Sequence, residues 1–164
     1  QTSMLERIGA DYEILHKDLK IGQNSAWQQF TLAFNNVPDK GAQYYLIDDK
    51  NPNDPKISLG SRTKFFKQYF RYIRAGAQRI GAESSNPEFD PLAFINANKK
   101  YVVVVKASFP GAISVEGLPP GLYGISYTTT SEADVNLSDI TLKQNETLKT
   151  NIPEKGVITI FPKN

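Results

Sequence analysis

Few residues in this sequence are of types that carry out catalysis or hold a metal. Asp48 and Asp49 form the most conspicuous carboxylate pair. Because neighbouring side chains on a strand point to opposite faces, these two cannot readily act on one substrate bond, and we expect loop solvation or a turn. His16 is the only histidine. It lies near a predicted helix end among charged residues, where we expect a capping or surface role rather than catalysis.

Trp27 and Gln29 are the candidate binding residues. They lie two positions apart in the alternating stretch 24–34, which predicts a strand, so their side chains share one face. An indole face can stack against a sugar ring, and a glutamine amide can donate to a sugar hydroxyl. A core aromatic at a strand end and a satisfied polar residue are the alternatives, and the pattern leaves them open.

The composition describes a soluble globular protein. In 164 residues, 40% are hydrophobic and 22% charged, and the 19 basic and 17 acidic residues give a net charge of +2. This balance lacks the basic patch of a nucleic-acid binder, and no apolar run approaches the roughly 20 residues of a membrane span. The chain has no cysteine, so thiolate metal sites and disulfides are excluded. We expect no metal and no cofactor.

The first part of the chain predicts helix, strand and helix. Ser3 and Glu6 fit a capping box before a helix over 3–19. A loop over 35–60 with three prolines follows the strand, interrupted by an apolar run at 44–47. The second helix is predicted over 61–74, with its last turn rich in arginine. Its buried face consists of Phe66, Tyr69, Phe70 and Ile73.

After Gly76 the hydrophobic period changes from helical to two. Apolar runs separated by turn signals recur at regular spacing, which is typical of an antiparallel β-sandwich. The run at 101–105 is apolar throughout and predicts a central strand buried on both faces. We therefore predict a mainly β chain with two helices, divided into domains at 1–74 and 75–164. The predicted strands are 78–82, 92–96, 101–107, 113–117, 123–130, 140–143, 147–151 and 157–161.

Residues 1–74 cannot form a satisfactory core alone. One strand between two helices leaves its edges unpaired and its faces incompletely covered. We therefore expect this part to come from a larger α/β structure. In isolation, its exposed strand edges and aromatic side chains predict dimers or larger species, unless it folds back on the sandwich or the upstream chain is present.

The order of several segments resembles family 30 glycoside hydrolases. In that family the last barrel helices, the eighth barrel strand and the sandwich strands follow one another as these segments do. The resemblance implies that 1–74 is the end of a (β/α)₈ barrel and 75–164 a fused β-sandwich. The segments that carry it are ILHKDL (14–19), NSAWQ (24–28), YYLID (44–48), YFRYIR (69–74) and YVVVV (101–105).

The resemblance implies retaining hydrolysis of β-linked glycans by a secreted or periplasmic protein. Such chemistry needs two carboxylates roughly 5–5.5 Å apart, which the family carries on barrel strands before this segment. We therefore expect no catalytic residue here, and no activity from the chain alone. Trp27 and Gln29 would face the substrate at the barrel mouth, although the family often has further aromatics where Gln29 and Phe30 stand. The alternative is a stand-alone carbohydrate-binding or interaction sandwich without catalysis.

Overall fold

The structure is a computed structural model that describes residues 3–6, 11–29, 31–35, 43–60 and 62–163. The chain divides into two compact units, Gln1–Phe66 and Lys67–Asn164. The boundary falls inside the second helix, α2 (Thr63–Phe70). The proposed domains, 1–74 and 75–164, stay a prediction.

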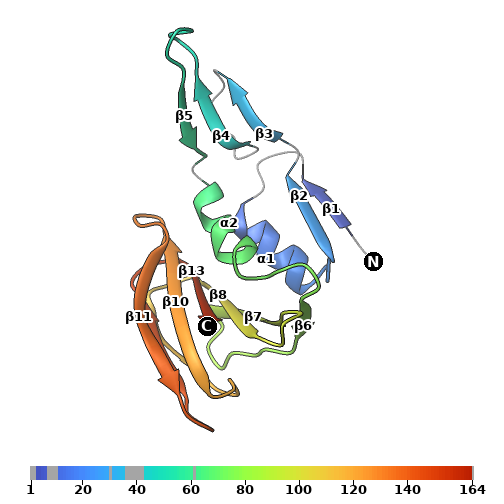
Figure 1. Ribbon diagram of the computed structural model, residues 1–164, viewed down its shortest axis with the longest axis vertical. Helices are drawn as coiled ribbons and strands as arrows, with labels where there is room; N and C mark the ends of the chain where they lie inside the picture. Colours follow the sequence, from blue (N-terminus) through green and yellow to red (C-terminus); the bar gives the residue numbers. More distant parts are fainter. Residues whose placement is uncertain (1–2, 7–10, 30, 36–42, 61, 164) are drawn as a thin grey trace. The chain divides into compact units, whose positions relative to one another are not determined.

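The first unit contains one helix, the start of α2 and two small sheets. Parallel pairing of β1 with β2 makes one sheet, and β3, β4 and β5 make the other, in that order. Figure 1 shows both sheets. The elements are β1 (Ser3–Glu6), α1 (Tyr12–Lys20), β2 (Ala26–Gln29), β3 (Thr31–Asn35), β4 (Gln43–Asp48) and β5 (Lys56–Leu59).

The predicted start of the first helix is wrong. Residues 3–6, which we expected to cap and begin a helix, form β1, and 7–10 lie outside the described residues. The helix begins at Tyr12 after Asp11, whose carboxylate accepts from the backbone N–H groups of Glu13 (3.0 Å) and Ile14 (3.1 Å). Aspartate is a strong N-cap, and residues 3–6 instead pair with β2 along one edge.

The predicted strand 24–34 is two strands in two sheets. Residue 30 lies outside the described residues; β2 before it pairs with β1, and β3 after it pairs in parallel with β4. Our expectation of a lone strand with both edges unpaired is therefore wrong. The predicted loop also contains more structure than expected. The apolar run at 44–47 lies in β4, which forms an antiparallel pair with β5.

Helix α2 is shorter than predicted. It ends at Phe70, so the arginines at 71 and 74 lie in the turns that follow, and Gly76 adopts a left-handed φ of 82°. Phe66 and Tyr69 are buried as expected, whereas Phe70 is 40% exposed. Ile73, also predicted on this face, is half-buried and lies beyond the end of the helix. The helical period therefore identified only the first two residues of the predicted buried face correctly.

The second unit is the predicted β-sandwich. All eight predicted strands are present, and each pairs antiparallel with its neighbours. One sheet has six strands in the order β11-β10-β13-β8-β7-β6, which Figure 1 shows side by side, and the other has β12 and β9. The strands are β6 (Gln78–Ile80), β7 (Phe89–Ile95), β8 (Tyr101–Ala107), β9 (Gly111–Val115), β10 (Gly121–Thr129), β11 (Val135–Leu142), β12 (Leu148–Ile152) and β13 (Gly156–Pro162).

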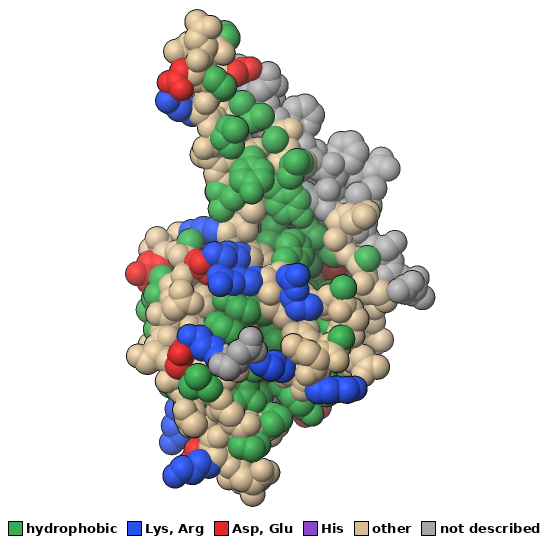
Figure 2. Space-filling view, in the orientation of Figure 1, with side chains coloured by type: hydrophobic (Ala, Val, Ile, Leu, Met, Phe, Trp, Pro, Cys, Tyr) green, Lys and Arg blue, Asp and Glu red, His purple; other side chains and the backbone are tan. Residues whose placement is uncertain are grey.

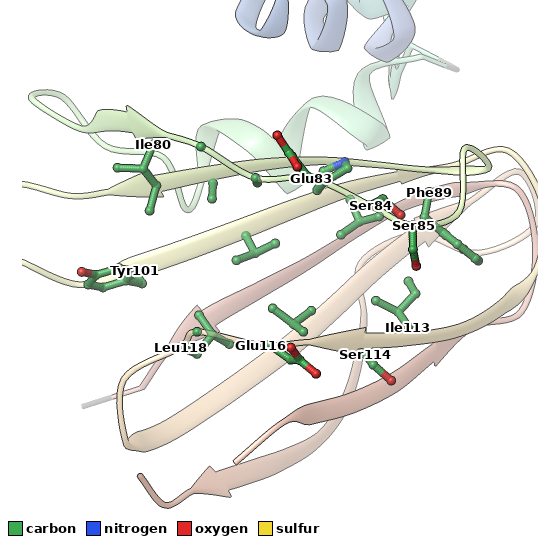
Figure 3. A pocket seen from close by; sticks show the side chains of 18 residues that line it. Ile80, Glu83, Ser84, Ser85, Phe89, Tyr101, Ile113, Ser114, Glu116 and Leu118 are labelled. Atoms are coloured by element: carbon green, nitrogen blue, oxygen red, sulfur yellow. The ribbon is translucent and has the colours of Figure 1, made fainter. Parts of the chain in front are cut away.

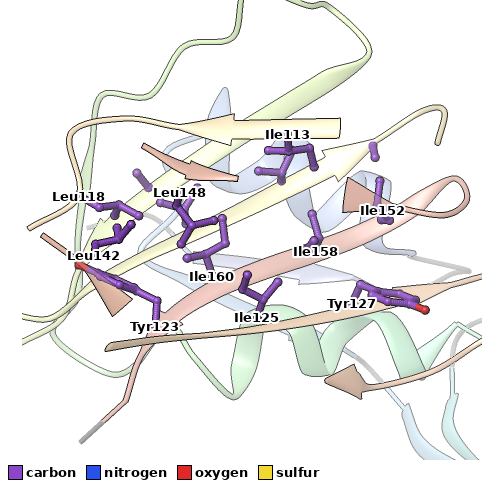
Figure 4. Packing of buried hydrophobic residues seen from close by; sticks show 14 residues of the cluster. Ile113, Leu118, Tyr123, Ile125, Tyr127, Leu142, Leu148, Ile152, Ile158 and Ile160 are labelled. Atoms are coloured by element: carbon purple, nitrogen blue, oxygen red, sulfur yellow. The ribbon is translucent and has the colours of Figure 1, made fainter. Parts of the chain in front are cut away.

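The core of this unit lies between the two sheets (Figure 4). Alternate residues of β8 point into it, as the period of two requires. The prediction for this strand is confirmed: it is central, and its residues 102–105 are all buried. Truncating one such aliphatic side chain to alanine costs about 2–5 kcal/mol. The labelled members of the cluster in Figure 4 are Ile113, Leu118, Tyr123, Ile125, Tyr127, Leu142, Leu148, Ile152, Ile158 and Ile160.

The outer face of the six-stranded sheet carries buried hydroxyls rather than only apolar groups. Gln68, from the part of α2 that belongs to this unit, donates through Nε2 to Ser126 Oγ (3.2 Å) and Thr128 Oγ1 (3.0 Å). Thr159 Oγ1 donates to the Gln68 carbonyl at 2.9 Å. All four residues are fully buried, so this network holds α2 on the sheet. Gln68 Oε1, which is also buried, has no hydrogen-bond partner among the described residues.

Candidate functional site

Trp27 lies on β2 and is half-buried. Its indole Nε1 donates to Asp18 Oδ2 at 3.0 Å, and Asp18 comes from the last turn of α1. The indole N–H is the only hydrogen-bond donor of a tryptophan side chain, so this bond directs the Nε1 edge of the ring toward Asp18. The ring is thus held in one orientation while part of its surface stays exposed.

An aromatic cluster of the first unit surrounds Trp27. Its ring lies 5.2 Å from the Phe66 ring at an interplanar angle of 58°, and Phe66 meets Tyr44 edge-on at 6.0 Å. Thr63 Oγ1 donates to the Tyr44 carbonyl at 3.1 Å, which ties β4 to the start of α2. Burial raises the pKa of Tyr44 above its usual value. These contacts make Trp27 part of a packed cluster, which fits either alternative left open by the sequence.

Gln29, the second candidate, is the last residue of β2 and lies opposite Glu6 in the parallel register. Its side chain lies outside the described residues. Its role in binding therefore stays a prediction.

His16 is buried, with 1% of its surface exposed. The expected surface role is wrong. Helix α1 presents Tyr12, Leu15 and His16 on one side, because these positions follow the helical spacing. The charged neighbours in sequence point elsewhere on the helix. The buried histidine is thus a core residue of the first unit.

Asp48 ends β4 and does form a turn, as predicted. Its Oδ1 accepts from the backbone N–H of Lys50 at 3.2 Å, the bond of an Asx turn. Asp49 follows it outside the strand. Among the described residues, no group of three or more His, Cys, Asp or Glu side chains could hold a metal ion.

A groove of about 600 Å³ lies wholly within the second unit (Figure 3). Its floor consists of residues from β7 and β8, and its walls are 80–85 on one side and 113–118 on the other. Phe89 and Tyr101, both partly buried, also line it. Sequence reasoning missed this groove, because it arises from unequal sheet sizes that no local pattern reveals.

Two carboxylates lie on opposite walls of this groove. Glu83 follows β6 and Glu116 follows β9, and both are exposed. Within the described part of the chain, neither carboxylate has a hydrogen bond or ion pair. The groove therefore combines an apolar floor with an acidic rim.

The sheet β3-β4-β5 in the first unit exposes an apolar face. Tyr45 is 42% exposed, Leu59 51% and Ile57 69%. Tyr45 pairs with Leu59, and Ile57 pairs with Ile47, so all lie on one face. Figure 2 shows hydrophobic side chains at the surface over β4 and β5. Single exposed apolar residues are common, whereas a contiguous group of them is less so.

The fold is similar to part of several solved structures, two of them family 30 glycoside hydrolases. The catalytic domain of a family 30 xylanase C from Talaromyces cellulolyticus matches 93% of this chain with a TM-score of 0.75 and 18% identity. A family 30 endoxylanase from Clostridium papyrosolvens matches the whole chain (100%) with a TM-score of 0.69 and 13% identity. A conserved exported protein from Bacteroides fragilis matches 90% with a TM-score of 0.71 and 20% identity.

These likenesses confirm the predicted fold resemblance. This chain spans 34%, 41% and 32% of the three matched chains, respectively. No protein-family model and no curated protein matches the sequence. Among the described helices, none is long and apolar enough to cross a membrane. The class defined by the fold is therefore a β-sandwich joined to α/β elements, as found within family 30 glycoside hydrolase structures.

Proposed function

We propose that this chain is the C-terminal portion of a retaining O-glycosyl hydrolase that acts on β-linked glycans. One observation carries the proposal. The structural match to a family 30 catalytic domain covers 93% of this chain but only 34% of that domain, at a TM-score of 0.75. The sandwich strands begin only at Gln78. A match over 93% of the chain therefore extends beyond the sandwich into the α/β elements before it. The remainder of the parent hydrolase would supply the two catalytic carboxylates.

In this proposal the β-sandwich is an accessory domain. Its large side chains are mostly used in its own core, and among the described residues of the second unit only Phe70 and Phe109 are exposed aromatics, at 40% and 60%. A sugar-binding sandwich usually needs several exposed rings on one surface. This weighs against the alternative of a stand-alone carbohydrate-binding module.

Trp27 and Gln29 are proposed to contact the glycan in the parent hydrolase. Support comes from the parallel pairing of β1 and β2, because the carboxyl ends of parallel barrel strands form the active-site mouth. Gln29 is the last residue of β2 and Trp27 lies two positions before it. We propose a secreted or periplasmic location; one of the similar structures is an exported protein.

The proposal is tested by the stereochemistry of the parent reaction. Proton NMR of a β-linked xylo- or gluco-oligosaccharide, followed from the first minutes after adding the parent protein, should show the β-anomer of the product first. Early appearance of the α-anomer would contradict the retaining mechanism. Affinity electrophoresis of the 164-residue chain in xylan or β-glucan gels tests the alternative, which predicts retardation where our proposal predicts none.

A further inference from the structure

Two buried oxygen atoms of the second unit have no hydrogen-bond partner among the described residues. They are Gln68 Oε1 on α2 and Asp134 Oδ1, which comes just before β11. Gln68 is fully buried, and the Asp134 side chain is 28% exposed although its Oδ1 is covered. Leaving a buried acceptor without a donor is costly, and folded proteins seldom do so. These two atoms therefore mark a place where a donor is needed.

The two atoms belong to one hydrogen-bond network. Gln68 Nε2 donates to Thr128 Oγ1 at 3.0 Å, and the backbone N–H of Asp134 donates to the same oxygen at 3.1 Å. The Gln68 amide, from α2, and Asp134, from the turn between β10 and β11, thus meet at one buried hydroxyl. Because each acceptor is only a few covalent bonds from an atom that contacts Thr128 Oγ1, one small molecule can reach both.

The charges around Asp134 indicate that the donor is neutral. Its other oxygen, Oδ2, accepts from Lys67 Nζ, and Arg71 Nη1 lies 3.8 Å from the same oxygen. The carboxylate charge is therefore already balanced by two cations, which would repel a metal ion or an ammonium group. Gln68 contributes no charge. A water molecule is neutral and can donate two hydrogen bonds, which matches the two acceptors.

We propose that one ordered water molecule lies between α2 and the turn that joins β10 to β11, and donates one hydrogen bond to Gln68 Oε1 and one to Asp134 Oδ1. Buried waters in proteins typically bond to polar groups that the chain itself leaves unsatisfied. The inference does not depend on the proposed function, because every group involved lies in the second unit.

The water would complete a continuous series of polar contacts between the helix and the sheet. The series leads from Lys67 and Arg71 through Asp134 and the water to Gln68, whose carbonyl accepts from Thr159 Oγ1 on β13. Helix α2 would then be attached at two places, to the turn before the edge strand β11 and to the interior strand β13.

A high-resolution crystal structure of the full 164-residue chain tests the proposal directly. We expect one water oxygen within about 2.5–3.0 Å of both Gln68 Oε1 and Asp134 Oδ1. A metal ion there, recognisable for calcium by its roughly six to eight oxygen ligands, would overturn the proposal. A Gln68 amide turned over so that Nε2 donates directly to Asp134 Oδ1 would also overturn it, as would the lack of any ordered atom between the two acceptors.

NMR of the same chain gives a second measurement, in solution. A water held at this place should give a cross-peak between the water resonance and the backbone N–H of position 134. Gln68→Met removes one acceptor but leaves the Thr128 hydroxyl, so loss of the cross-peak would be due to the water. Gln78→Met, the same change at an exposed position of β6, is the matched control and should keep the cross-peak.

A cross-peak that survives Gln68→Met in an otherwise native amide spectrum would contradict the proposal. If that variant does not fold, Asp134→Ala replaces it, because this side chain is partly exposed. It removes the other acceptor, and the cross-peak at position 134 should again be lost. Its persistence there would contradict the proposal in the same way.

Discussion

Trp27 is the residue on which the proposed substrate contact depends most. Its indole N–H is already bonded to Asp18 and its ring already contacts Phe66. A glycan would therefore meet the remaining exposed part of the ring by stacking, without gaining a hydrogen bond from Nε1. The contribution to binding is expected to come from the aromatic face.

Trp27→Ala in the parent hydrolase should raise KM about tenfold, which corresponds to ~1.4 kcal/mol of lost binding. Trp27→Phe is the matched control, because it removes the bond to Asp18 but keeps an aromatic face. It should raise KM by less than Trp27→Ala. Steady-state kinetics on a soluble β-linked oligosaccharide provide the measurement. An unchanged KM in Trp27→Ala would show that the residue serves packing alone.

Through Tyr127, the stability of the sandwich should depend on pH in the alkaline range. Its hydroxyl donates to Glu132 Oε2 at 2.6 Å, and this bond, together with burial and the Glu132 charge, raises the pKa of Tyr127 to about 12. The folded state therefore holds this proton more tightly than the unfolded state. Its stabilising contribution is complete below the unfolded tyrosine pKa near 10 and is lost as the pH rises toward 12.

Tyr127→Phe should lower the free energy of unfolding by ~1 kcal/mol at pH 7, because the carboxylate partner is exposed and the bond only modestly stabilising. The difference from the unmodified chain should become smaller above pH 10, as the native tyrosine loses its advantage. Urea unfolding at pH 7, 9 and 11 measures this. A difference that stays constant or widens between pH 9 and 11 would contradict the assignment.

At the scale of the elements, α2 is held to the six-stranded sheet by the buried amide of Gln68. Gln68→Ala removes its two hydrogen bonds to hydroxyls. Thr128 Oγ1 keeps the bond from the Asp134 N–H, but Ser126 Oγ loses its donor, and a buried group left without a partner costs about 1–3 kcal/mol. We expect a loss of ~2–3 kcal/mol in urea unfolding. Gln78→Ala, at an exposed position of β6, is the control and should change stability by less than about 0.5 kcal/mol. Equal effects would argue against the network.

The strands of the sandwich could be predicted because each is a local pattern. All eight runs after Gly76 are strands, and turn residues separate them in the sequence. Their pairing could not be read in the same way. β13 lies between β8 and β10, a consequence of contacts over long sequence separations that leave no local signal.

The first unit was predicted less well for a different physical reason. Ser3 and Glu6 match a capping box, but Asp11 is the actual cap, and a four-residue pattern cannot show which of two caps is used. The burial of His16 depends on which side of α1 meets its surroundings. Trp27 was found as a candidate from its position, whereas its bond to Asp18 required the structure.

At the scale of the whole molecule, the isolated chain is expected to self-associate. The exposed apolar face of β4 and β5 includes Tyr45, Ile57 and Leu59, and burying one such side chain contributes roughly 1.5–3 kcal/mol. Ile57→Lys should shift light scattering toward monomer, because it places a charge in that contact. Lys149→Glu, an exposed position on β12, is the control and should not. A wild-type chain that is monomeric at all concentrations would contradict the expectation.

The central claim is that these residues belong to a glycoside hydrolase whose catalytic carboxylates lie elsewhere in the protein. Reducing-sugar release from xylan, β-glucan and aryl β-glycosides, measured side by side for the parent protein and the purified 164-residue chain, tests it most directly. The account predicts release by the parent and none by the chain alone. Turnover by the isolated chain, or a parent inactive on every β-linked substrate, would contradict it.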